Sequence, residues 1–177
     1  MRSRVLLEGR PGVGKTTVAA RLAELLRERG IDVRGFLTHE VRERGRRVGF
    51  TVRTLDGTAD TLAHVDLGGP VRVGKYGVDV DAFERVALPA LEKPPARAVV
   101  VIDEIGKMEL ASEAFRDAVL RVFDAPVDVV ATAHVFRHAI TDTLKGRADV
   151  DRFEVTRATR DVLPEQLADR LTHGSAA

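Results

Sequence analysis

The chain has 177 residues, of which 44% are hydrophobic and 31% are charged, a balance that is typical of a globular protein and excludes a disordered one. The formal net charge of +1 provides no global electrostatic attraction to nucleic acid or to a membrane surface. Because cysteine is absent, disulfide bonds, thiolate metal sites and a cysteine nucleophile are excluded. The N-terminal apolar run is only VLL and no stretch of about 18 apolar residues occurs, so we expect a cytoplasmic protein without a signal peptide or membrane span.

The first half of the chain begins with a strand and a helix. The apolar run before Gly9 predicts a buried strand, and apolar residues at helical spacing predict a helix over 16–29. Residues 32–58 are rich in β-branched and aromatic side chains with breaks at RG and DG, which predicts an antiparallel hairpin or meander. The glycine-rich residues 67–79 are expected to be irregular, and a helix is expected from about 79 to 91.

In the second half of the chain, the predicted strands and helices alternate more regularly. Continuous apolar runs predict strands over 98–104 and 127–134 that are covered on both faces. The remaining expected elements are helices over 112–123, 137–145 and 163–171 and a short strand over 152–156. Ser112 is the candidate N-cap of the first of these helices.

This alternation predicts an α/β fold with a mostly parallel central sheet, helices on both faces and the hairpin as an antiparallel addition. We expect a single domain over residues 1–172 and a flexible tail over 173–177.

The most informative motif lies between the first strand and the first helix. It reads GRPGVGKT and matches G-x-x-x-x-G-K-[ST] in full, with the flanking strand and helix that this motif requires. The backbone N–H groups of such a loop and the helix N-terminus bind phosphate oxygens. Lys15 is expected to reach the β- and γ-phosphates, and the Thr16 hydroxyl to ligate Mg²⁺. The predicted nucleotide-binding residues of this segment are Gly9, Arg10, Pro11, Gly12, Val13, Gly14, Lys15, Thr16 and Thr17.

Two carboxylates follow the buried strand VVVI. A P-loop needs a second acid at the end of another strand to hold the metal, and Asp103 supplies it. Because side chains alternate along a strand, Glu104 is expected on the other side, where it would be the catalytic base that polarises water. We therefore assign Asp103 with Thr16 to Mg²⁺, and both acids to the nucleotide site. A solvated acidic pair at a strand end is the alternative.

The tetrapeptide DEIG also fits the D-x-x-G pattern of regulatory GTPases. Those proteins read guanine with an N-K-x-D or T-K-x-D element on a later strand, and no such tetrapeptide occurs in this chain. The later strand ends in ATAH instead, which disfavours a GTPase switch.

Five segments together resemble one family. They are GRPGVGKTT, GFLTHEVRERGRRVGF, VGKYGV, VIDEIGKMEL and EVTRATRDVLP, in the order and spacing of the small P-loop nucleoside-triphosphatases of thermophilic type, which include the cancer-related nucleoside-triphosphatase of animals. The resemblance covers about residues 4–166. It implies a three-layer RecA-like fold and slow Mg²⁺-dependent hydrolysis of several nucleoside triphosphates to diphosphate and phosphate. The family's last segment usually reads T-x-x-N-R-D, whereas Thr159 stands in place of that Asn, which puts any contact made by the Asn in doubt.

Several single residues are further candidates. Lys107 lies in the segment that the resemblance marks as functional, where a cation would offset charge on the γ-phosphate, and a surface lysine is the alternative. Tyr76, the only tyrosine, would stack on a base or bond to a phosphate, or pack in the ordinary way. His134 is a candidate sensor of the γ-phosphate. Candidate phosphate contacts that the sequence does not rank are Arg137, Arg147, Arg157 and Arg160.

Four arginines lie at the expected hairpin tip, namely Arg42, Arg44, Arg46 and Arg47. They could contact nucleic-acid phosphates. Glu40 and Glu43 interrupt the cluster and the whole chain is nearly neutral, so a solvated tip is favoured over a nucleic-acid contact.

Three functions are weighed on these residues. The leading hypothesis is a monomeric nucleoside-triphosphatase with broad base specificity that uses Lys15, Glu104 and Lys107 in catalysis. The second is a nucleotide or nucleoside kinase that transfers the γ-phosphate to an acceptor, with VRERGRR as a lid. The third is a nucleic-acid-associated ATPase. Glu104 directly after Asp103 favours hydrolysis, because a base placed there activates water.

Overall fold

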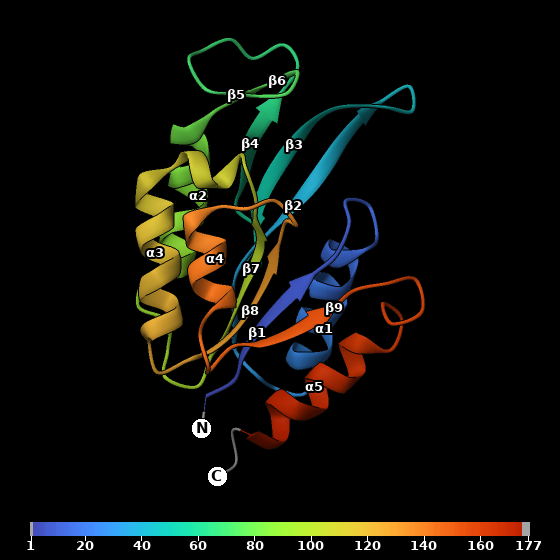
Figure 1. The fold of residues 1–177 in the computed structure, drawn as a ribbon, viewed down its shortest axis with the longest axis vertical. Helices are drawn as coiled ribbons and strands as arrows, with labels where there is room; N and C mark the ends of the chain where they lie inside the picture. The colour runs from blue at the N-terminus through green and yellow to red at the C-terminus, as the bar shows by residue number, and fades with distance from the viewer. Residues whose placement is uncertain (1, 175–177) are drawn as a thin grey trace.

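A computed structural model of the chain describes residues 2–174, which form a nine-stranded sheet with helices on both faces (Figure 1). The strands are β1 (Arg4–Glu8), β2 (Val33–Glu43), β3 (Arg46–Thr54), β4 (Ala59–His64), β5 (Arg72–Val73), β6 (Tyr76–Val78), β7 (Val99–Ile105), β8 (Asp128–Ala133) and β9 (Asp151–Glu154). The helices are α1 (Lys15–Glu28), α2 (Val80–Leu91), α3 (Glu113–Asp124), α4 (Ala139–Lys145) and α5 (Leu163–Gly174), with a short 3₁₀ helix η1 (Glu109–Ala111).

The sheet has a parallel half and an antiparallel half. Its strand order is β5-β6-β4-β3-β2-β7-β8-β1-β9. The strands β2, β7, β8, β1 and β9 run parallel, whereas β3, β4, β6 and β5 add to β2 as antiparallel neighbours. The expected α/β fold with an antiparallel addition is therefore confirmed, and the addition is a full four-strand extension rather than one hairpin.

Two hydrophobic cores fill the two sides of the sheet. Apolar residues of α2, α3 and α4 pack on one face, and those of α1 and α5 pack on the other (Figure 1). Strand β7 supplies both cores, because Val100 and Ile102 join the first and Val99 and Val101 join the second. Burying each such side chain contributes roughly 1.5–3 kcal/mol, so both helical layers hold this strand in place.

Local signals explain several helix boundaries. Ser112 caps α3 as expected, since its hydroxyl accepts a hydrogen bond from the Phe115 backbone N–H at 2.9 Å. Asp79 caps α2 in the same way through the Ala82 N–H at 2.8 Å. A cap of this kind is worth about 1 kcal/mol.

The C-terminal end differs from its expected form. Helix α5 continues to Gly174, so the chain is helical beyond the expected boundary at residue 172. The rest of the expected tail, residues 175–177, lies outside the described residues. Within the described part of the chain, no helix has the length and apolar character needed to cross a bilayer.

Candidate active site

The GRPGVGKT loop connects β1 to α1 at the carboxyl end of the parallel strands (Figure 1). Gly14 has φ 114°, in the left-handed region that favours glycine, and it stands at the N-cap of α1. Gly9 is required by a close approach, because a Cβ there would lie 2.7 Å from the carbonyl oxygen of Val155. The loop is thus shaped by glycine at both ends, and Thr16 and Thr17 occupy the first turn of the helix behind it.

Lys15 is buried beneath this loop, with 6% of its side chain exposed. Its Nζ donates to the carbonyl oxygens of Gly9 at 3.0 Å and Arg10 at 3.4 Å. The same Nζ lies 3.9 Å from Glu104 Oε2. The ammonium group therefore stands between the loop and the acids of β7.

Asp103 is fully buried and bonded from three elements. The Thr132 hydroxyl on β8 donates to its Oδ1 at 2.6 Å, and the Thr38 backbone N–H on β2 donates to its Oδ2 at 3.3 Å. The Thr16 hydroxyl of the P-loop helix also bonds to this carboxyl. Burial raises the pKa of Asp103, and these three hydrogen bonds and the charge of Lys15 act in the opposite direction.

A β-bulge changes the direction in which Glu104 points. In the β7–β8 ladder Ile102 pairs with Ala131 and Ile105 with Ala133, so two residues, Asp103 and Glu104, face one residue of β8. A bulge of this kind interrupts alternation and re-aims side chains. The expectation that alternation separates the two acids does not hold, since Lys15 Nζ lies 3.9 Å from Glu104 Oε2 while the hydroxyl of the next residue, Thr16, bonds to Asp103.

Glu104 lies in a mostly buried position with polar neighbours. Its Oε1 is 3.4 Å from His134 Nε2, at the end of β8, and its Oε2 faces Lys15. Burial raises the pKa of Glu104 to about 7, the negative charge of Asp103 adds to this, and Lys15 opposes it. Burial and the nearby cations Lys15 and Lys107 lower the pKa of His134, which favours the neutral imidazole. A carboxyl with a pKa near neutrality is suited to exchanging a proton with water.

Glu109 is a further site residue that the sequence did not single out. It begins η1, has 4% exposure, and lies beside Glu104, because a Cβ added at Gly106 would be 2.8 Å from Glu109 Oε2 and 3.2 Å from Glu104 Oε1. Burial raises the pKa of Glu109 well above its ordinary range, and the charge of Glu104 raises it further. The pattern KMEL gives no signal for this burial, which depends on how η1 packs.

Glu109→Gln should make the protein less sensitive to alkaline pH. A carboxyl whose pKa is raised by folding stabilises the fold fully below its unfolded pKa of about 4.3, and this contribution is lost as pH rises through the folded pKa. The loss is at most about 1.4 kcal/mol per pH unit. Thermal unfolding should therefore show that the stability of the variant, relative to that of the wild type, is higher at pH 8 than at pH 5. The exposed Glu43→Gln is the matched control, and a gap between variant and wild type that is equal at both pH values would contradict a protonated Glu109.

Lys107 follows Glu104 by three residues in the chain and is exposed. Its Nζ stands 5.2 Å from the centre of the Phe136 ring, in the segment that follows β8, and its charge reaches His134. The structure thus brings Lys107 to the rim of the site.

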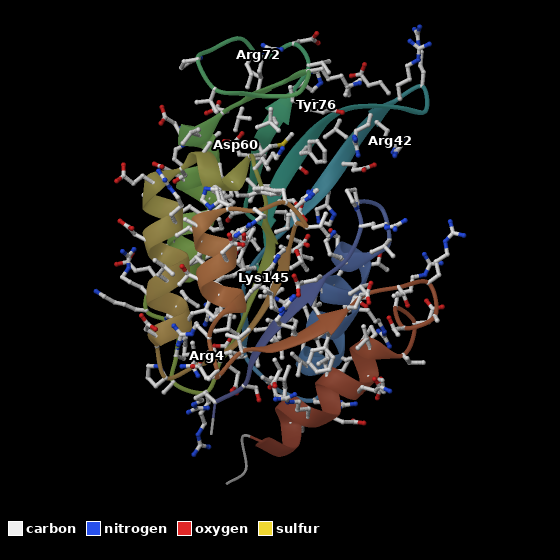
Figure 2. All side chains as sticks on the ribbon, in the orientation of Figure 1. Arg4, Arg42, Asp60, Arg72, Tyr76 and Lys145 are labelled. Carbon is white, nitrogen blue, oxygen red and sulfur yellow. The ribbon has the colours of Figure 1, made fainter. Side chains whose placement is uncertain are left out.

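Tyr76 lies elsewhere. It is 7% exposed on β6, its ring packs edge-on against Phe50 at 5.3 Å, and its hydroxyl accepts a hydrogen bond from Arg47 Nε at 3.1 Å. Five strands separate β6 from β1, and the side-chain view shows Tyr76 at the hairpin end of the molecule (Figure 2). The predicted base or phosphate contact is corrected to packing, because the ring and the hydroxyl are occupied within the antiparallel half.

The arginines of the hairpin are partly neutralised. Glu40 pairs with Arg42 at 2.6 Å and with Arg47 at 2.7 Å (Arg42 is labelled in Figure 2). Arg44 and Arg46 are exposed at the tip. These ion pairs favour the solvated tip that the interrupted charge pattern predicts.

The loop between β9 and α5 contains the departure from the family pattern. The Thr159 hydroxyl accepts from the Thr156 N–H at 2.9 Å and donates to the Glu154 carbonyl at 3.1 Å. The Thr159 N–H donates in turn to the Thr156 hydroxyl at 3.2 Å. Thr159 therefore stabilises this loop through hydrogen bonds to other residues of the same loop.

Comparison with known proteins agrees with this geometry. The family described as NTPase matches residues 4–168. The nucleoside-triphosphatase THEP1 of Thermofilum pendens is 50% identical, with 92% of both chains covered. The cancer-related nucleoside-triphosphatase of Homo sapiens is 42% identical, with 93% of this chain and 95% of the human protein covered.

Solved structures show the same fold. The crystal structure of THEP1 from the hyperthermophile Aquifex aeolicus superposes with a TM-score of 0.87 at 36% identity, covering 95% of this chain and 98% of that one. The solution structure of a human cancer-related nucleoside triphosphatase gives 0.84 at 40% identity, covering 97% and 98%. The match along almost the whole sequence, together with the shared fold, shows that this chain belongs to the P-loop NTPase family that includes the THEP1 and cancer-related nucleoside-triphosphatases.

Proposed function

We propose that this protein hydrolyses nucleoside triphosphates to diphosphate and phosphate with little preference for the base. The observation that supports this most directly is the convergence of Lys15, Asp103 and Glu104 on one point beside the phosphate loop. The curated relatives are named nucleoside-triphosphatases, which agrees with this reaction.

Each residue has a distinct role in the proposal. The loop residues from Gly9 to Thr17 would bind the phosphates, and Lys15 would stabilise negative charge on the β- and γ-phosphates. Glu104 would accept a proton from the attacking water, a role that its raised pKa suits. Lys107 at the rim would offset charge on the γ-phosphate from the opposite side, while Tyr76 has no part.

The donor set also fits Mg²⁺. Thr16 and Asp103 supply a hydroxyl and a carboxylate that contact each other, and oxygen ligands are those that Mg²⁺ prefers. Burial alone disfavours the charged form of Asp103, so a cation beside it would restore the carboxylate. When bound, Mg²⁺ would neutralise phosphate charge.

The test is phosphate release from ATP, GTP, CTP and UTP with purified protein. We expect turnover of all four that is lost on chelating Mg²⁺. Turnover of only one nucleotide would contradict the proposed broad specificity. Absence of turnover with all four would contradict the proposed hydrolysis. Adding candidate nucleoside acceptors and RNA to the same assay tests the alternatives. Phosphoryl transfer confined to one acceptor would indicate a kinase, and a rate that rises with RNA would indicate a nucleic-acid-associated ATPase.

A further inference from the structure

The loop after β9 is fixed along the phosphate loop at two points. At one end, the Val155 N–H donates to the Glu8 carbonyl at 2.7 Å, and the Val155 carbonyl closes against Gly9. At the other end, Arg160 Nη1 donates to the Val13 carbonyl at 3.5 Å. A Cβ added at Gly14 would lie 3.3 Å from Arg160 Cδ. The stem of Arg160 therefore lies against the start of α1.

Backbone hydrogen bonds of the loop fix the position of the Arg160 main chain. Its N–H donates to the Thr156 carbonyl at 3.0 Å, in the turn that Thr156 and Thr159 hold with reciprocal hydrogen bonds. Its ion pair with Asp161 is long, at 3.8 Å, and that carboxylate is 83% exposed. A pair of this kind is weak, so the guanidinium can turn to another partner.

Sheet order gives the direction of a bound nucleotide. The acids that the γ-phosphate must approach lie on β7, and β9 lies on the opposite side of β1. Figure 1 shows the β9–α5 loop on the same side of the molecule as the P-loop. If the γ-phosphate points toward β7, the nucleoside extends the other way, toward β9 and Arg160.

We propose that Arg160 binds the nucleoside end of the substrate, with its guanidinium plane against the face of the base. Every base presents a π-face, so such a contact adds affinity without selecting among bases. This inference rests on the proposed function for the direction of the substrate. It gives a physical reason for broad base use in a chain that has no guanine-reading tetrapeptide.

The test compares Arg160→Ala with Arg160→Lys, using calorimetric binding of non-hydrolysable analogues of ATP, GTP, CTP and UTP in Mg²⁺. Inorganic tripolyphosphate, which has no nucleoside, is the matched ligand. Both variants should bind all four analogues about five- to thirtyfold more weakly and bind tripolyphosphate as the wild type does. Arg121→Ala, which changes an exposed arginine of α3, should leave all affinities unchanged.

Four results would overturn the inference. An equal loss for tripolyphosphate would place Arg160 on the phosphates or in the scaffold, and full rescue by lysine would reduce its role to charge. Unchanged affinity for the analogues would refute the contact, and an equal loss in Arg121→Ala would make the effect a general one of the protein's positive charge. Because binding is read without turnover, a wild type that binds analogues but releases no phosphate would refute only the proposed hydrolysis.

Discussion

Lys15→Ala is expected to reduce phosphate release by at least about 10²-fold, because it removes the cation that lies between the loop and the acids. The loss has two causes. The β- and γ-phosphates lose a charged partner, and Glu104 and Asp103 lose the positive charge that opposes the burial of two carboxylates. Steady-state phosphate release and calorimetric nucleotide binding should both fall.

Because Lys15 is buried, its replacement needs a check on folding. Lys15→Met keeps most of the side-chain volume without the charge, and thermal unfolding of both variants should remain cooperative. Arg21→Ala, an exposed cation on the same helix, should retain full activity. Activity of Lys15→Ala within tenfold of the wild type would refute the P-loop assignment.

Glu104→Gln should separate binding from chemistry. The amide keeps the shape of the side chain and its approach to His134, but it cannot take a proton from water. We expect binding of a non-hydrolysable ATP analogue with Mg²⁺ to be retained, and single-turnover hydrolysis to fall about 10²–10⁴-fold.

The matched control is Glu113→Gln, which changes an exposed carboxylate at the start of α3. It should hydrolyse at the wild-type rate. If Glu104→Gln lost less than tenfold, the general-base role would have to move to another group. A parallel loss of binding would instead show that Glu104 acts mainly in binding the nucleotide rather than in proton transfer.

Much of this architecture could be predicted from local sequence. The P-loop spacing, the helix that follows it, the Ser112 cap and the two continuous apolar strands are signals that neighbouring residues carry by themselves. The buried strand before Asp103 also placed an acid beside the loop, because the carboxyl ends of parallel strands meet at one edge.

What could not be predicted depends on partners far away in the chain. Alternation along β7 fails at Asp103 because the bulge exists only in register with β8. Tyr76 sits in a glycine-rich segment that looked like a binding loop, yet Phe50 and Arg47 fix its ring and hydroxyl. The local sequence does not distinguish Glu109 from a surface acid, because its burial beside Gly106 depends on the packing of η1.

The division of the sheet into two halves has a practical consequence. All the groups assigned here to substrate lie on the parallel half and its loops, whereas the turn at Arg44 and Gly45 ends the hairpin with both residues exposed and at positive φ. Exposed loop tips of this kind tolerate insertions. A fluorophore or short affinity peptide attached at this turn would therefore be held at the exposed end of the hairpin, outside both hydrophobic cores, where it could report on the protein or immobilise it on a surface.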